Sequence, residues 1–266
     1  MRQPIRLQTS LRERVWGRTS LAPFFPDVSQ PIGEAWFLAE EELPLLVKLI
    51  FTSERLSVQV HPADGEDGPR GKTEMWHILE TDPGATIALG FREPITRERL
   101  WEATRTGEVE HLLNWVPVKP GDTYFTPAHT VHAIGAGIVL CEIQQNSDVT
   151  YRLWDYGRLR EIHVDKAVPI SDLDVHPGAS QAVPIGAGWS ELVRCPYFVT
   201  QSIRMRPGEE RSLPSQPCHL LICVEGAGNI GNRKFHAGEV WLLPEGSEQP
   251  TVTAGEATHL LRTFVP

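Results

Sequence analysis

The sequence contains little cysteine and no long apolar segment. Its four cysteines show neither the density of a disulfide-stabilised secreted domain nor the paired C-x-x-C spacing of a structural zinc site. The most apolar stretch, residues 43–51, is short and includes Pro44 and Lys48, and the first ten residues lack the apolar core of a signal peptide. We therefore expect a cytoplasmic protein with buried thiols and no contact with a membrane.

Lysine is scarce as well. Of the 25 basic residues only five are lysines, and 34 acidic residues bring the formal net charge to −9. No block or stripe of basic residues occurs, which argues against a nucleic-acid partner. A lysine that falls inside a predicted strand is therefore informative in this chain.

Glycine and proline are abundant, with 22 of each. Average usage would give about 32 together. They are spread without a G-X-Y period, and 41% of the residues are hydrophobic, so both a collagen-like and a disordered chain are excluded. The composition predicts a folded, turn-rich, all-β protein.

The order of patterns along the chain predicts two β units. Alternating and apolar runs typical of strands fill residues 45–62, 72–80 and 116–143. Residues 96–115 instead predict two short helices, with Thr96 as N-cap and Gly107 as a break. Residues 165–188 are rich in Pro, Gly, Ala and Ser and are the predicted linker. The predicted units are therefore residues 1–164 and 189–266.

A short internal repeat relates the two units. GDTYFTP at residues 121–127 and GEVWLLP at residues 238–244 share one frame, and each follows a predicted strand, a glycine turn and a short strand. The spacing between the glycine turn and this frame is longer in the first unit, by about the length of the helical segment. We infer two related β units, of which the first carries a helical insertion.

Four potential metal ligands fall in the first unit. Alternation places Gln59 and His61 on one strand face, Glu74 lies on the next strand, and His132 follows a proline turn. Two imidazoles, one carboxylate and one amide suit Zn²⁺ or a similar divalent ion, and such groups are costly to bury without a partner. In the second unit Gln249 stands where the first has His132, which predicts a metal site in the first unit only.

Several long motifs resemble a known family. LSVQVHPAD, GKTEMWHIL, PAHTVHAIGAG and EIQQNSDVTYRLWDYGR are similar to segments of the short bacterial type I mannose-6-phosphate isomerases. The resemblance implies two cupin-type jelly-roll barrels, the second without a metal site, and one zinc ion per chain held by Gln59, His61, Glu74 and His132. It also implies that the enzyme interconverts mannose 6-phosphate and fructose 6-phosphate through an enediol.

The resemblance, together with the few lysines, suggests further site residues. Glu142 matches a carboxylate for proton transfer, and Arg152 matches an active-site arginine that stabilises the enediolate or holds the phosphate. Arg158 matches a basic position associated with phosphate binding. Lys72 shares the strand face of Glu74 and is a third catalytic candidate, and Lys48, a charge within an apolar strand, is a second phosphate candidate.

Some points stay open at this stage. The base is Glu142, a metal-bound water or Lys72, and the chain is a monomer or a homodimer. His129 stands where the family usually has glycine, so a positive φ is expected there, with the side chain directed into the site or outward.

Alternative functions are isomerisation of another phosphosugar such as glucose 6-phosphate, and a non-catalytic metal cupin that binds a sugar or nucleotide sugar. An iron oxygenase is disfavoured by the amide ligand Gln59 and the clustered basic residues.

Overall fold

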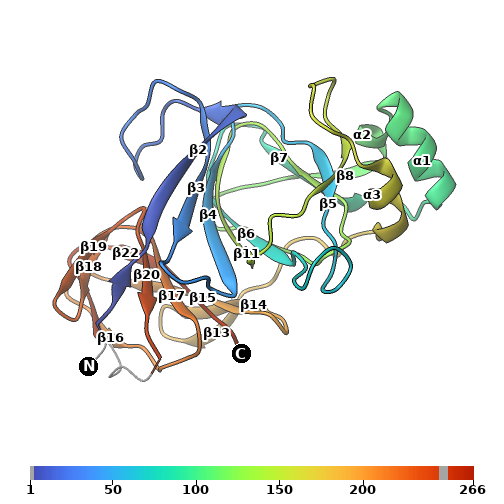
Figure 1. The fold of residues 1–266 in the computed structure, drawn as a ribbon. Helices are drawn as coiled ribbons and strands as arrows, with labels where there is room; N and C mark the ends of the chain where they lie inside the picture. Colours follow the sequence, from blue (N-terminus) through green and yellow to red (C-terminus); the bar gives the residue numbers. More distant parts are fainter. Residues whose placement is uncertain (1–2, 246–250) are drawn as a thin grey trace.

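The computed structural model describes residues 3–245 and 251–266. Within them the fold is mostly β, as the composition predicted, with four sheets and three short helices (Figure 1). The helices are α1 (Arg97–Thr106), α2 (Val109–Leu112) and α3 (Val164–Ile170). Among the described residues, none of the helices has the length and apolar character that a membrane span requires.

Two sheets are built from the first part of the chain. The six-stranded sheet consists, in spatial order, of β2 (Gln8–Arg18), β3 (Ile32–Leu38), β4 (Leu45–Phe51), β11 (Ile138–Gln145), β6 (Glu74–Thr81) and β9 (Thr123–Thr126). The five-stranded sheet consists of β12 (Tyr151–Trp154), β5 (Val58–Val60), β10 (His132–Ile134), β7 (Thr86–Phe91) and β8 (Leu113–Pro117).

The other two sheets come mainly from the C-terminal part. The seven-stranded sheet consists of β1 (Ile5–Arg6), β20 (Val240–Leu243), β17 (His219–Glu225), β22 (Thr258–Phe264), β15 (Val199–Met205), β14 (Trp189–Arg194) and β13 (Val183–Gly186). The four-stranded sheet consists of β16 (Glu210–Ser212), β21 (Thr251–Ala254), β18 (Ala227–Ile230) and β19 (Arg233–His236). The N-terminal strand β1 thus pairs with C-terminal β20.

Separate apolar cores join successive layers. Trp76 and Ile87 belong to a core shared by the six- and five-stranded sheets. On its other face the six-stranded sheet packs against the seven-stranded sheet, where Leu49 meets residues such as Ile222. Because this sheet is covered on both faces, every residue of β4 (LLVKLIF) is buried, and only Lys48 interrupts its apolar run. The core shared with the seven-stranded sheet covers one face of the six-stranded sheet. The opposite face points toward the five-stranded sheet and also carries polar side chains such as Lys48.

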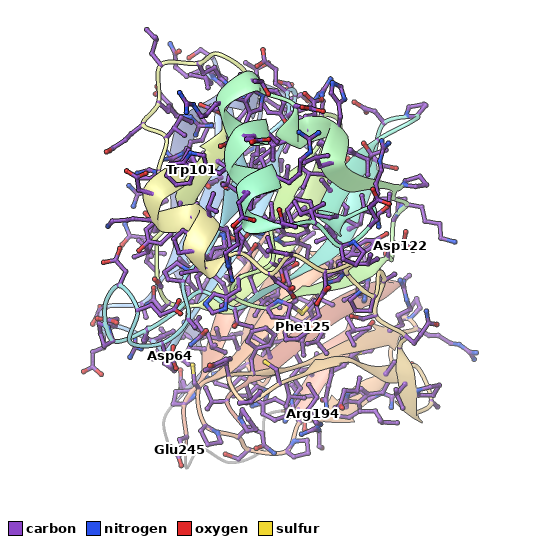
Figure 2. All side chains as sticks on the ribbon, turned by 90° about the vertical axis from the view of Figure 1, so that its right-hand side faces the viewer. Asp64, Trp101, Asp122, Phe125, Arg194 and Glu245 are labelled. Atoms are coloured by element: carbon purple, nitrogen blue, oxygen red, sulfur yellow. The ribbon has the colours of Figure 1, made fainter. Side chains whose placement is uncertain are left out.

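The helices and the C-terminal sheets lie at opposite ends of this stack. In Figure 2, Trp101 on α1 lies near the top of the molecule and Arg194 on β14 near the bottom. The helices cover the outer face of the five-stranded sheet through a further apolar core. The last core joins the seven- and four-stranded sheets.

The predicted repeat has the same local structure in both copies. β9 and β20 each begin shortly after a glycine with positive φ, Gly121 at 92° and Gly238 at 86°. β9 pairs with β6 and β20 pairs with β17, which are the strands predicted before each copy. This equivalence supports two related β units, while the boundaries at residues 164 and 189 stay predictions.

The predicted linker contains regular structure. Within residues 165–188 lie most of α3 and the whole of β13, which pairs with β14. The four cysteines form no disulfide: Cys141 and Cys223 are buried, whereas Cys195 and Cys218 are only partly buried.

The helical insertion begins as predicted. The Thr96 hydroxyl accepts a hydrogen bond from the backbone N–H of Arg99, and Gly107 ends α1 in the left-handed conformation at a φ of 81°. A Cβ at Gly107 would lie 2.7 Å from the Trp154 ring, so glycine is required for packing as well. The predicted segment extends too far, because Leu113 already begins strand β8.

Replacing the helix cap tests how firmly the insertion is held. We expect Thr96→Ala to lower the free energy of unfolding by about 1 kcal/mol, because the Arg99 N–H loses its acceptor. Urea unfolding monitored by tryptophan fluorescence measures the change. Thr96→Ser, which keeps the hydroxyl, is the control, and equal loss in both variants would contradict a capping role.

Buried histidines outside the site make stability pH-dependent. Burial, together with Arg204, lowers the pKa of His77 to about 4, and burial lowers the pKa of His219 and His259 to about 3. Because unfolded histidine titrates near 6.5, the unfolded chain binds protons that the folded chain excludes as the pH falls below that value. These histidines make their full contribution to the free energy of unfolding above pH 6.5. The contribution is lost as the pH falls through 6.5 toward the folded-state pKa values, about 4 for His77 and about 3 for His219 and His259.

We therefore expect the free energy of unfolding to fall by about 1.4 kcal/mol per pH unit for each such histidine between pH 6 and 5. Urea unfolding of metal-free protein at several pH values measures the slope. His77→Gln should reduce the slope, and an unchanged slope would show that His77 binds its proton in the folded state.

Candidate metal centre and active site

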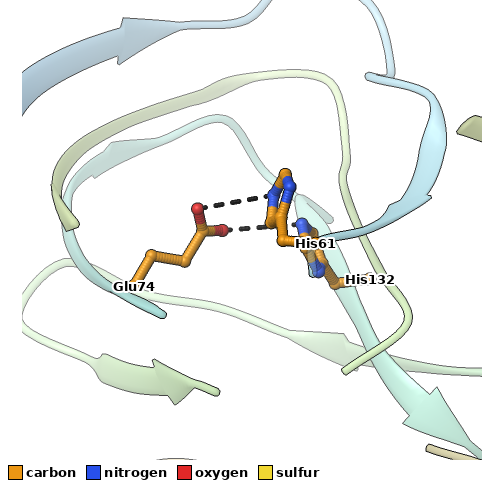
Figure 3. A group of neighbouring side chains, drawn as sticks. All are labelled: His61, Glu74 and His132. Atoms are coloured by element: carbon orange, nitrogen blue, oxygen red, sulfur yellow. Dashed lines mark ion pairs between the residues drawn. The ribbon is translucent and has the colours of Figure 1, made fainter. Parts of the chain in front are cut away.

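The candidate metal centre lies between the six- and five-stranded sheets (Figure 3). Glu74 is the first residue of β6, and His132 is the first residue of β10. Gln59 in the middle of β5 pairs directly with His132, and His61 follows β5. Short strands therefore hold the predicted ligands, and the alternation seen in the sequence directs them to one place.

The three ionisable ligands form a buried group. Figure 3 shows Glu74 facing both imidazoles: His61 Nε2 lies 3.5 Å from Oε2 and His132 Nε2 lies 3.5 Å from Oε1. One ligand atom from each residue lies within 4.8 Å of the others, and none of the three residues is more than 2% exposed. This is the only group of three or more such residues within the described part of the chain that could hold a metal. Gln249 lies outside the described residues.

Hydrogen bonds fix both imidazoles in the form that binds metals. Nδ1 of His61 is 2.9 Å from the Val149 carbonyl, and Nδ1 of His132 is 2.8 Å from the Thr130 carbonyl. A carbonyl can only accept, so Nδ1 carries the proton and the lone pair of Nε2 points toward Glu74. Burial lowers the pKa of His61 well below its usual value and that of His132 to about 4, which keeps both rings neutral.

This arrangement fits a divalent cation. The Nε2 atoms of His61 and His132 face the carboxylate oxygens of Glu74, whose Oε1 accepts no hydrogen bond from the described residues. Burial and the nearby Glu142 charge raise the pKa of Glu74 to about 7. The Gln59 amide lies 3.2 Å from His132 Nε2, and a half-turn about its last torsion would direct its oxygen toward the group. A cation bound among these atoms would accept the Nε2 lone pairs that the Lys72 ammonium and the Gln59 amide approach in this structure.

A row of alternating charges adjoins the ligands. Lys72 Nζ lies 2.8 Å from Glu74 Oε2, 3.0 Å from His61 Nε2 and 4.0 Å from Glu142 Oε1. Lys48 Nζ lies 3.1 Å from the same Glu142 oxygen. These residues are almost completely buried, so the sequence-predicted Lys48, Lys72 and Glu142 lie together with the ligands.

Strand register explains why Glu142 lies in this row. In the six-stranded sheet Lys48 on β4 is opposite Glu142 on β11, which is opposite Trp76 on β6. The Trp76 indole donates a hydrogen bond of 3.1 Å to Glu142 Oε2. Burial alone would raise the pKa of Glu142, but Lys48 and Lys72 lower it to about 2, so this carboxylate stays ionised at neutral pH.

The two predicted arginines are placed differently. Arg152 on β12 is paired with Gln59, so its side chain points to the same side of the sheet as the ligands, and its Nε is buried without a partner. Burial lowers the pKa of Arg152, and Arg160 and Arg14 add to this. Arg158 instead contacts Asp155 at 3.3 Å and donates to the Arg55 carbonyl. No contact joins Arg158 to the metal ligands within the described structure.

His129 has the predicted backbone conformation, with a φ of 75°. Its side chain is directed outward: Nε2 lies 2.7 Å from Glu66 Oε2, and both side chains are about one-third exposed. Of the two orientations considered from the sequence, the outward one is observed.

The sequence analysis missed several polar residues on this face. Trp76 lies two residues after Glu74, hence on the same strand face, and was given no role, although its indole donates a hydrogen bond to Glu142. Arg12 and Arg14 on β2, and Glu34 and Trp36 on β3, continue the charged row toward the sheet edge. Arg12, Arg14 and Trp16 alternate along the chain, but the apolar Leu11 and Val15 stand between them, so the sequence alone did not show which set faces inward.

The fold and the site together define a class of protein: a β protein with a buried two-histidine, one-carboxylate group suited to a divalent metal, beside a lysine and carboxylate row. Comparison with known proteins narrows this class. The chain is 32% identical to the mannose-6-phosphate isomerase ManA of Bacillus subtilis over 92% of its own length and 94% of that protein. It is 30% identical to the mannose-6-phosphate isomerase of Streptococcus mutans over 86% and 87% of the two chains. The chain therefore belongs to the mannose-6-phosphate isomerase family.

Solved structures agree with this assignment. The mannose 6-phosphate isomerase from Bacillus subtilis matches with a TM-score of 0.88 and 26% identity, over 99% of this chain and all of that chain. A phosphomannose isomerase from Salmonella typhimurium matches with a TM-score of 0.79 at 16% identity, over 98% of each chain, which shows a common fold. No family model matches the sequence.

Proposed function

We propose that the chain is a zinc-dependent isomerase that interconverts mannose 6-phosphate and fructose 6-phosphate through an enediol. The observation that supports this most is the buried group of His61, Glu74 and His132 beside the Lys72 and Glu142 pair, in a chain 32% identical to a relative of that name. Aldose–ketose isomerisation needs a base near C1 and C2 and an electrophile for the developing oxyanion.

The metal would be held by Gln59, His61, Glu74 and His132, one ion per chain. When bound, zinc supplies Lewis-acid polarisation and orientation of the sugar oxygens. Two neutral imidazoles with protonated Nδ1 and a buried carboxylate support this ligand set.

Proton transfer is assigned to Glu142. Its carboxylate would take the proton from C2 of the aldose and return it to C1, and the reverse reaction uses the same steps backward. Lys48 and Lys72 keep Glu142 ionised, as a base requires. Lys72, with an ammonium group 4.0 Å from Glu142, would donate a hydrogen bond to the sugar oxygen that gains charge, and Arg152 would stabilise the enediolate.

The phosphate would be held by basic side chains, for which the sequence suggests Arg158 and Lys48. Lys48 lies in the charged row, whereas Arg158 is already bound to Asp155. The proposed architecture is a catalytic cupin barrel in residues 1–164, a linker in 165–188 and a second barrel in 189–266 that serves for packing. The matching surroundings of β9 and β20 support the two-barrel arrangement.

Turnover of purified, zinc-loaded protein tests the proposal. Metal content is measured first, and then a coupled assay follows mannose 6-phosphate and glucose 6-phosphate in parallel. We expect turnover of mannose 6-phosphate and loss of turnover after chelation. If the protein turned over glucose 6-phosphate faster than mannose 6-phosphate, the proposed substrate would be wrong. If it bound the sugars and turned over neither, it would be a non-catalytic metal cupin.

A further inference from the structure

The face that carries the site gathers positive charge in an acidic chain. Four carboxylates lie on it or act on its cations, Glu34, Glu74, Glu142 and Asp148, against the following five cations: Arg12, Arg14, Lys48, Lys72 and Arg152. The excess exists before any metal is bound, although the whole chain has a net charge of −9. Such a surplus of buried or half-buried cations favours an anionic ligand.

Most of these cations already have an acidic partner. Lys48 and Lys72 bind Glu142 and Glu74, and Arg14 Nη2 lies 2.6 Å from Glu34 Oε2. Arg12 and Arg152 differ, because neither guanidinium makes a hydrogen bond or ion pair with the described residues and the Nε of each is buried. Arg152 is assigned to the enediolate in the proposed function, so Arg12 is the one without an assigned ligand. A buried donor without an acceptor is costly, so the site is complete only when an anion reaches Arg12.

Neighbouring side chains hold Arg12 in place. Its Cζ lies 4.9 Å from the centre of the Trp36 ring, and Lys48 Nζ lies 4.7 Å from the same ring. The Trp36 indole in turn donates a hydrogen bond of 3.0 Å to Glu34, the partner of Arg14. Arg12 is therefore fixed by stacking on Trp36, with its donors free, and Trp36 links it to the charged row.

We propose that Arg12 binds the phosphate of the substrate, with Trp36 as the platform that orients it. This inference rests on the proposed function for the substrate, and the ligand group is a phosphate monoester dianion. A guanidinium with free donors binds two phosphate oxygens at once. Arg158, the residue suggested by the sequence, has Nε and Nη2 bound to Asp155 and the Arg55 carbonyl, which leaves only its buried Nη1 without an acceptor.

The test compares Arg12→Met and Arg158→Met in the full-length zinc-loaded protein. Methionine keeps an unbranched stem against Trp36 and removes the charge, and Arg12→Lys restores the charge without the bidentate geometry. Arg194→Met, an exposed arginine on β14 paired with Glu191, is the matched control. Two readouts are used: kcat and KM for mannose 6-phosphate, and the rise in Tm produced by inorganic phosphate, which needs no turnover.

We expect Arg12→Met to raise KM by about 10- to 100-fold with a much smaller change in kcat, and to abolish the phosphate-induced rise in Tm. Arg12→Lys should be intermediate, Arg158→Met should change KM and the Tm response less than Arg12→Met does, and Arg194→Met should behave as the parent protein. The inference is overturned if Arg12→Met and Arg12→Lys keep the parent KM and Tm response, or if only Arg158→Met loses them. A parent protein that gains Tm from phosphate through Arg12 but turns over no sugar would uphold the phosphate site and refute the proposed function.

Discussion

His132→Gln is expected to remove the metal and the isomerase activity together. His132 supplies one of two buried neutral Nε2 lone pairs that face Glu74, and its Nδ1–H is fixed by the Thr130 carbonyl. Loss of an outer-sphere partner already costs roughly 10- to 100-fold in metal affinity, so loss of a direct ligand should cost more. Metal analysis after dialysis and the coupled assay measure the two effects.

His77→Gln is the matched control, since His77 is equally buried but lies on the opposite face of β6 from the site. We expect this variant to keep its metal and most of its turnover. Full metal content and full activity in His132→Gln would refute the ligand assignment, and equal loss in both variants would point to unfolding.

Arg152→Ala is expected to lower kcat by about 100- to 1,000-fold while the metal is retained, which is the usual effect of removing a donor to a developing oxyanion. Its Nε is buried without a partner and its strand neighbour is the proposed ligand Gln59, so its side chain points to the same side of the sheet as the proposed metal site. Steady-state kinetics measure kcat and KM, and metal analysis shows whether the variant keeps its metal.

Arg152→Lys should recover part of kcat, because the charge remains while the planar fork of donors is lost. A rise in KM with kcat unchanged would assign Arg152 to phosphate binding rather than to the enediolate. Loss of metal in Arg152→Ala would show that Arg152 supports the ligands through Gln59.

The sequence was informative where the chemistry lies within one strand. Lys72 and Glu74 lie two residues apart, and Gln59 and His61 do too, so alternation alone places each pair on one face. The turn conformation at His129 was also predictable, because the family that this motif resembles usually has glycine at that position.

Residues that meet only through strand register were harder to predict. Trp36, Lys48, Glu142 and Trp76 come from four strands and lie side by side because β3, β4, β11 and β6 pair in one register. No local pattern encodes that register, so the partners of Glu142 and the platform for Arg12 emerged only from the sheet. Arg158 shows the same limit, since its contact with Asp155 depends on how the loop after β12 folds.

The six-stranded sheet has consequences for how the chain can be divided. On β6, Glu74 and Trp76 face the site, while Met75 between them packs into the core shared with the C-terminal sheet. A fragment that ends near residue 164 would expose that apolar face to water and would lose the support behind its ligand strand. Because the two sheets share this core, we expect such a fragment to lose both its folded structure and the proposed metal site.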